Sequence, residues 1–166
     1  MKNPSVQQAV LSERQYQEVS VCLTELAAKL RISAVILVDS SGHVLARKVR
    51  EAFAGSSTLS TLAASTYAAS AEMARILGEP GNFKMVLHEG STRNVFVSSV
   101  NSDTFLVIVF ETGVAVGMVR LFTKKTLEAL LPVISRSEGS TRMDHLIDRD
   151  FKSLLDERLD STFKEF

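Results

Sequence analysis

Apolar residues recur at alternating spacings of three and four near the start of the chain, at Tyr16, Val19, Leu23, Leu26, Ala27 and Leu30. This period matches one face of an α-helix. Ser12 and Gln15 stand at the spacing of a capping box, in which two side chains satisfy backbone N–H groups of the first turn. The pattern therefore predicts an amphipathic helix from Ser12 to about Leu30.

A continuous apolar run at residues 34–38 follows and stops at a turn sequence, residues 39–42. A second short strand is predicted from His43 to about Lys48, so the two form a hairpin. Because the first strand lacks polar alternation, we expect helices to cover both of its faces.

A second helix is predicted from Ser57 to Leu77, capped by Ser56 or Ser57 and ended by Gly78 and Pro80. One of its stripes is predicted to face the sheet, and it consists of Leu59, Leu62, Thr66, Met73, Ile76 and Leu77. A second, nearly bare stripe carries Ala64, Ala68 and Ala71, with Glu72 and Arg75 beside it and Tyr67 interrupting it.

Three strand-like runs come next, at residues 83–88, 94–100 and 104–110, and they predict a meander. In the first run Phe83, Met85 and Leu87 alternate with polar positions. A helical period returns from about Ala115 to Ile134, where Pro132 is expected to kink or end the helix. The fold class is therefore α+β, with the order α-β-β-α-β-β-β-α, a central antiparallel sheet and helices on both faces.

The chain divides into four segments by composition. Residues 1–11 are predicted to be a flexible N-terminus, 12–135 the domain, 136–143 a polar linker and 144–166 a tail. The tail carries a helical apolar stripe that includes Phe151, Leu154 and Leu155. A helix of this length is too short to be stable alone.

Charge and composition exclude several functions. The 19 basic and 19 acidic residues cancel, so no overall field attracts nucleic acid or an anionic membrane, and we expect neither as a partner. No signal peptide or membrane-spanning run is recognised, which predicts a cytoplasmic protein. Cys22 is the one cysteine, so no intramolecular disulfide forms, and a buried thiol is the default interpretation.

No catalytic, cofactor or metal motif is found. None of the glycines begins a phosphate-binding loop, so the chain is not itself a P-loop GTPase. His43, His88 and His145 are not at metal-ligand spacing. Asp39, Glu89 and Glu111 each close a strand, where solvated acids are common, and Arg93 and Arg120 are interpreted as ordinary surface arginines. We therefore predict neither a cofactor nor catalytic residues.

The order of elements resembles the Roadblock family, related to the dynein light chains of that name, and within it the bacterial MglB-type polarity proteins. The residues that carry the resemblance are the turn at 38–42, the helix at 59–79, the turn at 88–90 and residues 117–121. It covers roughly residues 16–134, and the element order carries more weight than any one motif.

The resemblance implies a homodimer in which the strands at Phe83, Met85 and Leu87 pair across a two-fold axis, with Tyr67 nearby. It implies that the paired second helices form a platform for the GTP-bound form of a small Ras-like, MglA-type GTPase. The platform residues would be Ala64, Ser65, Ala68, Ala71, Glu72 and Arg75. Hydrolysis would be accelerated without an arginine finger, at a cell pole in a motility or polarity system. Phe151, Leu154 and Leu155 would form a second contact with the GTPase.

Other interpretations stay open at this stage. The alanine stripe is also explained by helix packing within a homodimer, and the tail stripe by docking on its own domain or on the dimer mate. A Roadblock scaffold would bind a GTPase, or another Roadblock-like chain, without changing hydrolysis. A small-molecule sensor of profilin-like or PAS-like shape would need a sizeable internal pocket, whereas the dense apolar strands favour a filled core.

Overall fold

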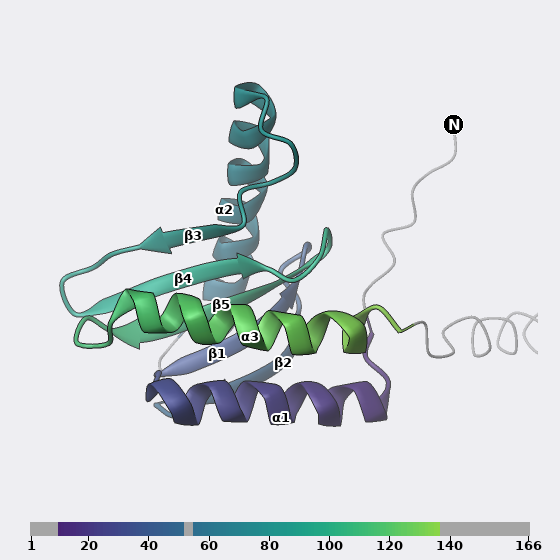
Figure 1. The fold of residues 1–166 in the computed structure, drawn as a ribbon, viewed down its shortest axis with the longest axis vertical. Coiled ribbons are helices and arrows are strands. Elements are labelled where there is room, and N and C mark those ends of the chain that lie inside the picture. Colours follow the sequence, from purple (N-terminus) through teal and green to yellow (C-terminus); the bar gives the residue numbers. More distant parts are fainter. Residues whose placement is uncertain (1–9, 52–54, 137–166) are drawn as a thin grey trace, which may run out of the picture. The chain divides into compact units, whose positions relative to one another are not determined.

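The structure is a computed structural model that describes residues 10–51 and 55–136. This part contains three helices and five strands in the predicted order (Figure 1). Their bounds are α1 Glu13–Leu30, β1 Ala34–Asp39, β2 Val44–Val49, α2 Ser56–Leu77, β3 Met85–His88, β4 Arg93–Ser99, β5 Thr104–Glu111 and α3 Val116–Ile134. The α+β class and the element order are confirmed. The predicted linker beyond residue 136 and the predicted tail lie outside the described residues.

The strands form one antiparallel sheet in the order β2-β1-β5-β4-β3. β5 lies in its middle, with Ala34 of β1 opposite Val109 on one side and Val97 of β4 opposite Val107 on the other. All residues of β1 are buried, as its uniform hydrophobicity predicts. β2 and β3 are the two edge strands.

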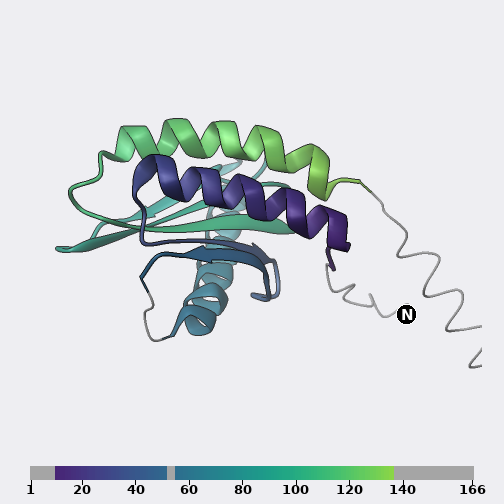
Figure 2. The same ribbon diagram turned by 90° about the horizontal axis from the view of Figure 1, so that it is seen from below.

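Helices cover both faces of the sheet. α1 and α3 lie side by side on one face and α2 crosses the other, as Figure 2 shows from a second direction. Side chains alternate between the two faces of a strand. Val35 and Leu37 accordingly pack under α1 and α3, while Ile36 and Val38 pack against α2. The sandwich with helices on both faces is confirmed.

Local signals place most helix ends correctly. The capping box at the start of α1 is present, with Ser12 and Gln15 each bonding the other's backbone N–H. α3 continues through Pro132 and ends at Ile134. The predicted serine cap of α2 is wrong, because Gly55 is the cap residue and has no side chain to bond the first turn.

The orientation of α2 differs from the prediction. The face that meets the sheet consists of Ser60, Ala63, Ala64, Tyr67, Ser70 and Ala74. The predicted sheet-facing residues Leu62, Met73, Ile76 and Leu77 are instead 59%, 51%, 70% and 74% exposed. Small residues at the contact allow the helix backbone to lie close to the strands, and Tyr67 fills the remaining space by stacking on Phe105 at 5.2 Å between ring centroids.

Candidate functional site

The exposed side of α2 carries a row of large apolar side chains: Leu62, Met73, Ile76 and Leu77, here called the α2 apolar row. Its members fall at helical spacings on one face. In Figure 1 the C-terminal half of α2, which holds three of the four, extends past the edge strand β3. All four side chains are more than half exposed within the described part of the chain.

The next face of α2 carries small and charged residues of the predicted platform. Ala68 is exposed and Ala71 is half-buried. Ser65 is exposed, and its hydroxyl donates to the carbonyl oxygen of Thr61 at 3.1 Å. The Arg75 guanidinium donates to the Glu72 carboxylate through Nε at 2.9 Å, and this hydrogen bond lowers the pKa of Glu72. The two charges thus compensate each other on the helix surface.

Two predicted interface residues are nearly buried in the described chain. Ala64 and Tyr67 are each 7% exposed and pack against the sheet. Both positions have one cause: the helix is rotated so that its alanine and serine positions, rather than its leucines, face the strands. The assignment of Ala64 to the platform and of Tyr67 to the dimer contact stays a prediction.

The edge strand β3 supplies the other half of the candidate surface. It pairs with β4 from Met85↔Ser98 to His88↔Val95. Within residues 10–51 and 55–136, no strand pairs with its other edge. Met85 and Leu87 are half-buried, and Phe83, which is also half-buried, precedes the strand rather than lying in it. An unpaired edge beside exposed apolar residues is typical of a surface that pairs with another chain.

Asp39 and Arg93, two of the groups considered for catalysis, make structural contacts. The Asp39 carboxylate accepts the backbone N–H groups of Ser41 and His43, both at 2.9 Å, and lies 3.2 Å from the His43 ring. These contacts hold the turn between β1 and β2. Arg93 pairs with Glu51 at 3.6 Å. In the described part of the chain, no three His, Cys, Asp or Glu side chains are grouped to hold a metal ion.

Cys22 lies on α1 and packs against the core, but it is half-buried rather than fully buried. Burial, and then the negative charge of Glu25, raise the pKa of its thiol.

Among the helices of the described residues, none has both the length and the apolar character needed to cross a bilayer.

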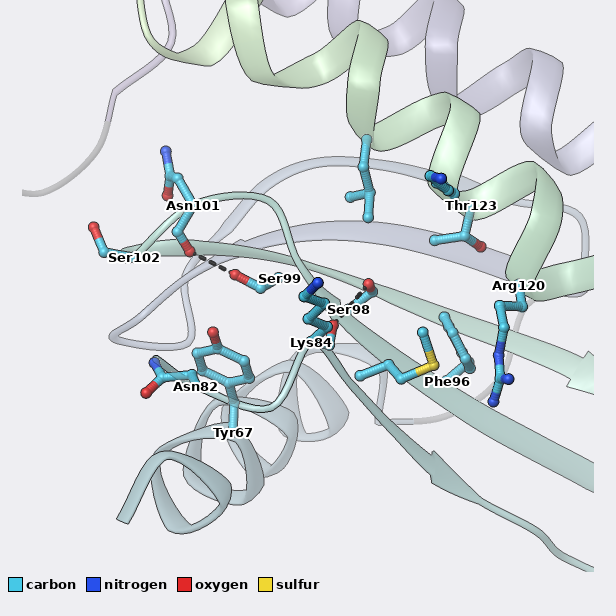
Figure 3. Close-up of a pocket in the computed structure, with 13 residues that line it drawn as sticks. Tyr67, Asn82, Lys84, Phe96, Ser98, Ser99, Asn101, Ser102, Arg120 and Thr123 are labelled. Carbon is cyan, nitrogen blue, oxygen red and sulfur yellow. Dashed lines mark hydrogen bonds between the residues drawn. The ribbon is translucent and has the colours of Figure 1, made fainter. Parts of the chain in front are cut away.

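The sequence did not predict a pocket of about 600 Å³ at the margin of the sheet, between α3, β4 and the segment that joins α2 to β3 (Figure 3). Its lining comes from residues between Tyr67 and Leu127, which are distant in sequence. Arg120 of α3 was the available signal, and it was interpreted as an ordinary surface arginine. The core at the centre of the sheet is filled, as predicted.

Comparison with known proteins agrees with this architecture. A family model of the Roadblock/LC7 domain matches residues 21–110. A solved structure described as MglB with a tetrameric arrangement is 30% identical, with a TM-score of 0.72, over 80% of this chain and 97% of that one. The gliding protein MglB from Thermus thermophilus is 29% identical, with a TM-score of 0.71, over 80% of this chain and 98% of that one.

A more distant likeness extends the same picture. Myxococcus xanthus MglB shares the fold at 24% identity and a TM-score of 0.71, over 78% of this chain and 99% of that one. No curated protein matches the chain. The family match spans more than half of the sequence and coincides with the observed sheet and with α2. The chain belongs to the Roadblock/LC7 family.

Proposed function

We propose that this protein is a homodimeric regulator that binds the GTP-bound form of a small Ras-like, MglA-type GTPase and accelerates its GTP hydrolysis. It acts in the cytoplasm, at a cell pole, in a bacterial motility or polarity system. The chain contributes no catalytic group of its own. The family membership and the MglB-like fold support this proposal.

The observation that carries the proposal is the exposed surface of α2 beside the open edge of β3. The outer edge of β3 pairs with no strand of the described chain, and Met73, Ile76 and Leu77 on α2 are more than half exposed. A second copy that pairs along β3 would bring the two α2 helices together and cover these apolar side chains. The neighbouring face of α2, with Ala68 and the Glu72–Arg75 pair, would then remain open to a GTPase.

The chemistry of this face supports acceleration without an inserted arginine. Arg75 is already bonded to Glu72 on its own helix, so transferring it to a phosphate would require breaking that pair. Small residues such as Ala68 allow close approach of the partner's backbone instead. A regulator of this kind works by holding the GTPase's own water-positioning and arginine groups in a productive geometry.

The deciding experiment is single-turnover GTP hydrolysis by the MglA-type GTPase of the same organism, with and without excess protein. Acceleration of about tenfold or more, which corresponds to about 1.4 kcal/mol of barrier, supports the proposal. A parallel pull-down compares the GTPase loaded with GDP or with a non-hydrolysable GTP analogue. Binding of the GTP form without acceleration would indicate a scaffold, and no binding to either form would refute the GTPase partner altogether.

A further inference from the structure

The pocket at the margin of the sheet has the size of a small-molecule site. Its volume of about 600 Å³ falls inside the range of about 300–1,000 Å³ that such sites occupy. Its lining comes mainly from α3, β4 and the segment entering β3, and α2 contributes only Tyr67 among the lining residues, whereas the surface proposed for the GTPase is the exposed side of α2 (Figure 3). Any ligand in it would therefore act at a second site.

One wall of the pocket is apolar and firmly held. Phe96 is 1% exposed and belongs to the core cluster, with Met85 and Leu127 packed against the same cluster. Ser98 donates to the carbonyl oxygen of Lys84 at 3.1 Å, which fixes the segment entering β3 beside this wall. A rigid apolar wall suits an aryl or alkyl group, because the wall loses little conformational entropy on binding.

The rest of the rim carries neutral polar side chains and three basic ones. Lys84, Arg120 and Lys124 line the pocket, and no acidic residue lines it with them. None of these three side chains forms an ion pair within the described part of the chain. In Figure 3 Arg120 descends from α3 beside Phe96, so a positive group stands next to the apolar wall. This local charge contrasts with the net charge of zero of the whole chain.

A second, independent observation is the Thr123 hydroxyl. Thr123 lines the pocket from α3, is 1% exposed, and its Oγ1 has no hydrogen-bond partner within the described residues. Buried hydroxyls nearly always have a partner, so this one marks a position where an acceptor is missing. Because Thr123 Oγ1 is itself buried, a ligand oxygen near Arg120 and Lys124 would supply that acceptor once the Thr123 side chain rotates toward the pocket.

We propose that this pocket binds a small organic anion, with an aryl or alkyl body carrying a carboxylate or phosphate group. The body packs against Met85, Phe96 and Leu127. The anionic group lies among Arg120, Lys124 and Lys84 and accepts a hydrogen bond from Thr123. Charge-assisted hydrogen bonds of this kind are about twice as strong as neutral ones, which makes the anionic group the main determinant of affinity.

Titration calorimetry on the full chain tests whether the pocket binds an organic anion. The three probes share a naphthalene ring and differ in head group: 2-naphthyl phosphate, 2-naphthoate and 2-naphthol. The two anions are expected to bind at least about tenfold more tightly than the neutral naphthol. The tighter of the two anions identifies the preferred head group. Equal affinity of all three probes, or no binding of either anion at millimolar concentration, would overturn the proposal.

Matched variants locate the binding. Arg120→Gln combined with Lys124→Gln removes two charges from exposed positions and is expected to weaken the better anion at least tenfold, with unchanged circular dichroism. Lys125→Gln is the control, since Lys125 lies on the same helix, 5.8 Å from the centre of the Phe122 ring, and does not line the pocket. Equal losses in the double variant and the control, or no loss in the double variant, would show that the anion binds elsewhere.

Discussion

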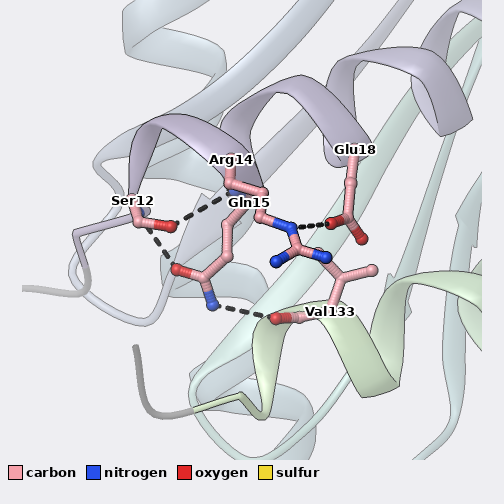
Figure 4. A network of polar contacts seen from close by, with 5 residues as sticks. All are labelled: Ser12, Arg14, Gln15, Glu18 and Val133. Carbon is pink, nitrogen blue, oxygen red and sulfur yellow. Dashed lines mark hydrogen bonds and ion pairs between the residues drawn. The ribbon is translucent and has the colours of Figure 1, made fainter. Parts of the chain in front are cut away.

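Gln15 Nε2 donates a 2.8 Å hydrogen bond to the backbone carbonyl oxygen of Val133, which joins the first turn of α1 to the last turn of α3 (Figure 4). The last four carbonyl groups of a helix have no partner within the helix, and Val133 carries one of them. The same Gln15 side chain accepts the Ser12 backbone N–H at 3.0 Å. One buried amide thus completes the ends of two helices that are far apart in sequence.

Gln15→Ala should lower the free energy of unfolding by about 1.5 kcal/mol, because it removes the Gln15 side chain from the capping box and leaves the Val133 carbonyl without this donor. Urea denaturation followed by circular dichroism measures the change. Gln17→Ala is the matched control: Gln17 is exposed and bonds only Glu13 among the contacts observed, so its loss should cost about 0.5 kcal/mol or less. Equal losses in the two variants would contradict the bridging role.

Gly42→Ala and Gly55→Ala separate backbone strain from steric contact. Both glycines have positive φ, +89° and +90°, which costs an L-residue about 1–2 kcal/mol. A Cβ at Gly42 would lie 2.9 Å from the Cα of Thr61 on α2, whereas none of the described residues lies within 4 Å of one at Gly55. Gly42→Ala should therefore cost about 1–3 kcal/mol more than Gly55→Ala in thermal or urea unfolding. A smaller loss at Gly42 would mean that α2 yields easily at this contact.

Thr123→Val and Thr126→Val apply one substitution to two hydroxyls of α3. The Thr123 hydroxyl is buried without a partner among the described residues, so its removal should raise the free energy of unfolding by about 1 kcal/mol. The Thr126 hydroxyl donates to the Phe122 carbonyl oxygen at 3.0 Å, and its removal should lower stability by about 0.5–1 kcal/mol. Chemical denaturation of the ligand-free protein compares the two. Destabilisation by Thr123→Val would show that its hydroxyl has a partner in solution.

The double variant Met73→Glu, Ile76→Glu tests the α2 apolar row as a homodimer contact. Two carboxylates placed in a covered apolar interface would be buried without partners. The dissociation constant of the dimer should therefore rise at least about a hundredfold. Analytical ultracentrifugation over a concentration series gives the constant. Leu131→Glu is the control, because Leu131 is 44% exposed on α3, away from this surface. A dimer that survives the double variant, or a wild-type protein that is monomeric, would reject the interface.

Ala68→Arg should weaken binding of the GTP-loaded GTPase at least about tenfold while leaving a folded dimer, because a long charged side chain prevents close approach. Biolayer interferometry measures the affinity for the GTPase loaded with a non-hydrolysable GTP analogue. Ala28→Arg, at an exposed alanine of α1, controls for the added charge. Unchanged binding would remove Ala68 from the platform, and loss of the dimer instead would assign it to helix packing between the two copies.

Local signals determined the element order, the capping box at Ser12 and the double burial of β1, because each depends on neighbours within a few residues along the chain. Tertiary structure decided which stripe of α2 meets the sheet. Periodicity defines the angles between side chains on a helix but not the rotation of that helix against its neighbour, so Ala64 was placed outside and Leu62 inside. The pocket could not be predicted from the sequence pattern either. Its lining residues Tyr67, Phe96 and Thr123 come together only when α2, β4 and α3 pack around the end of the sheet.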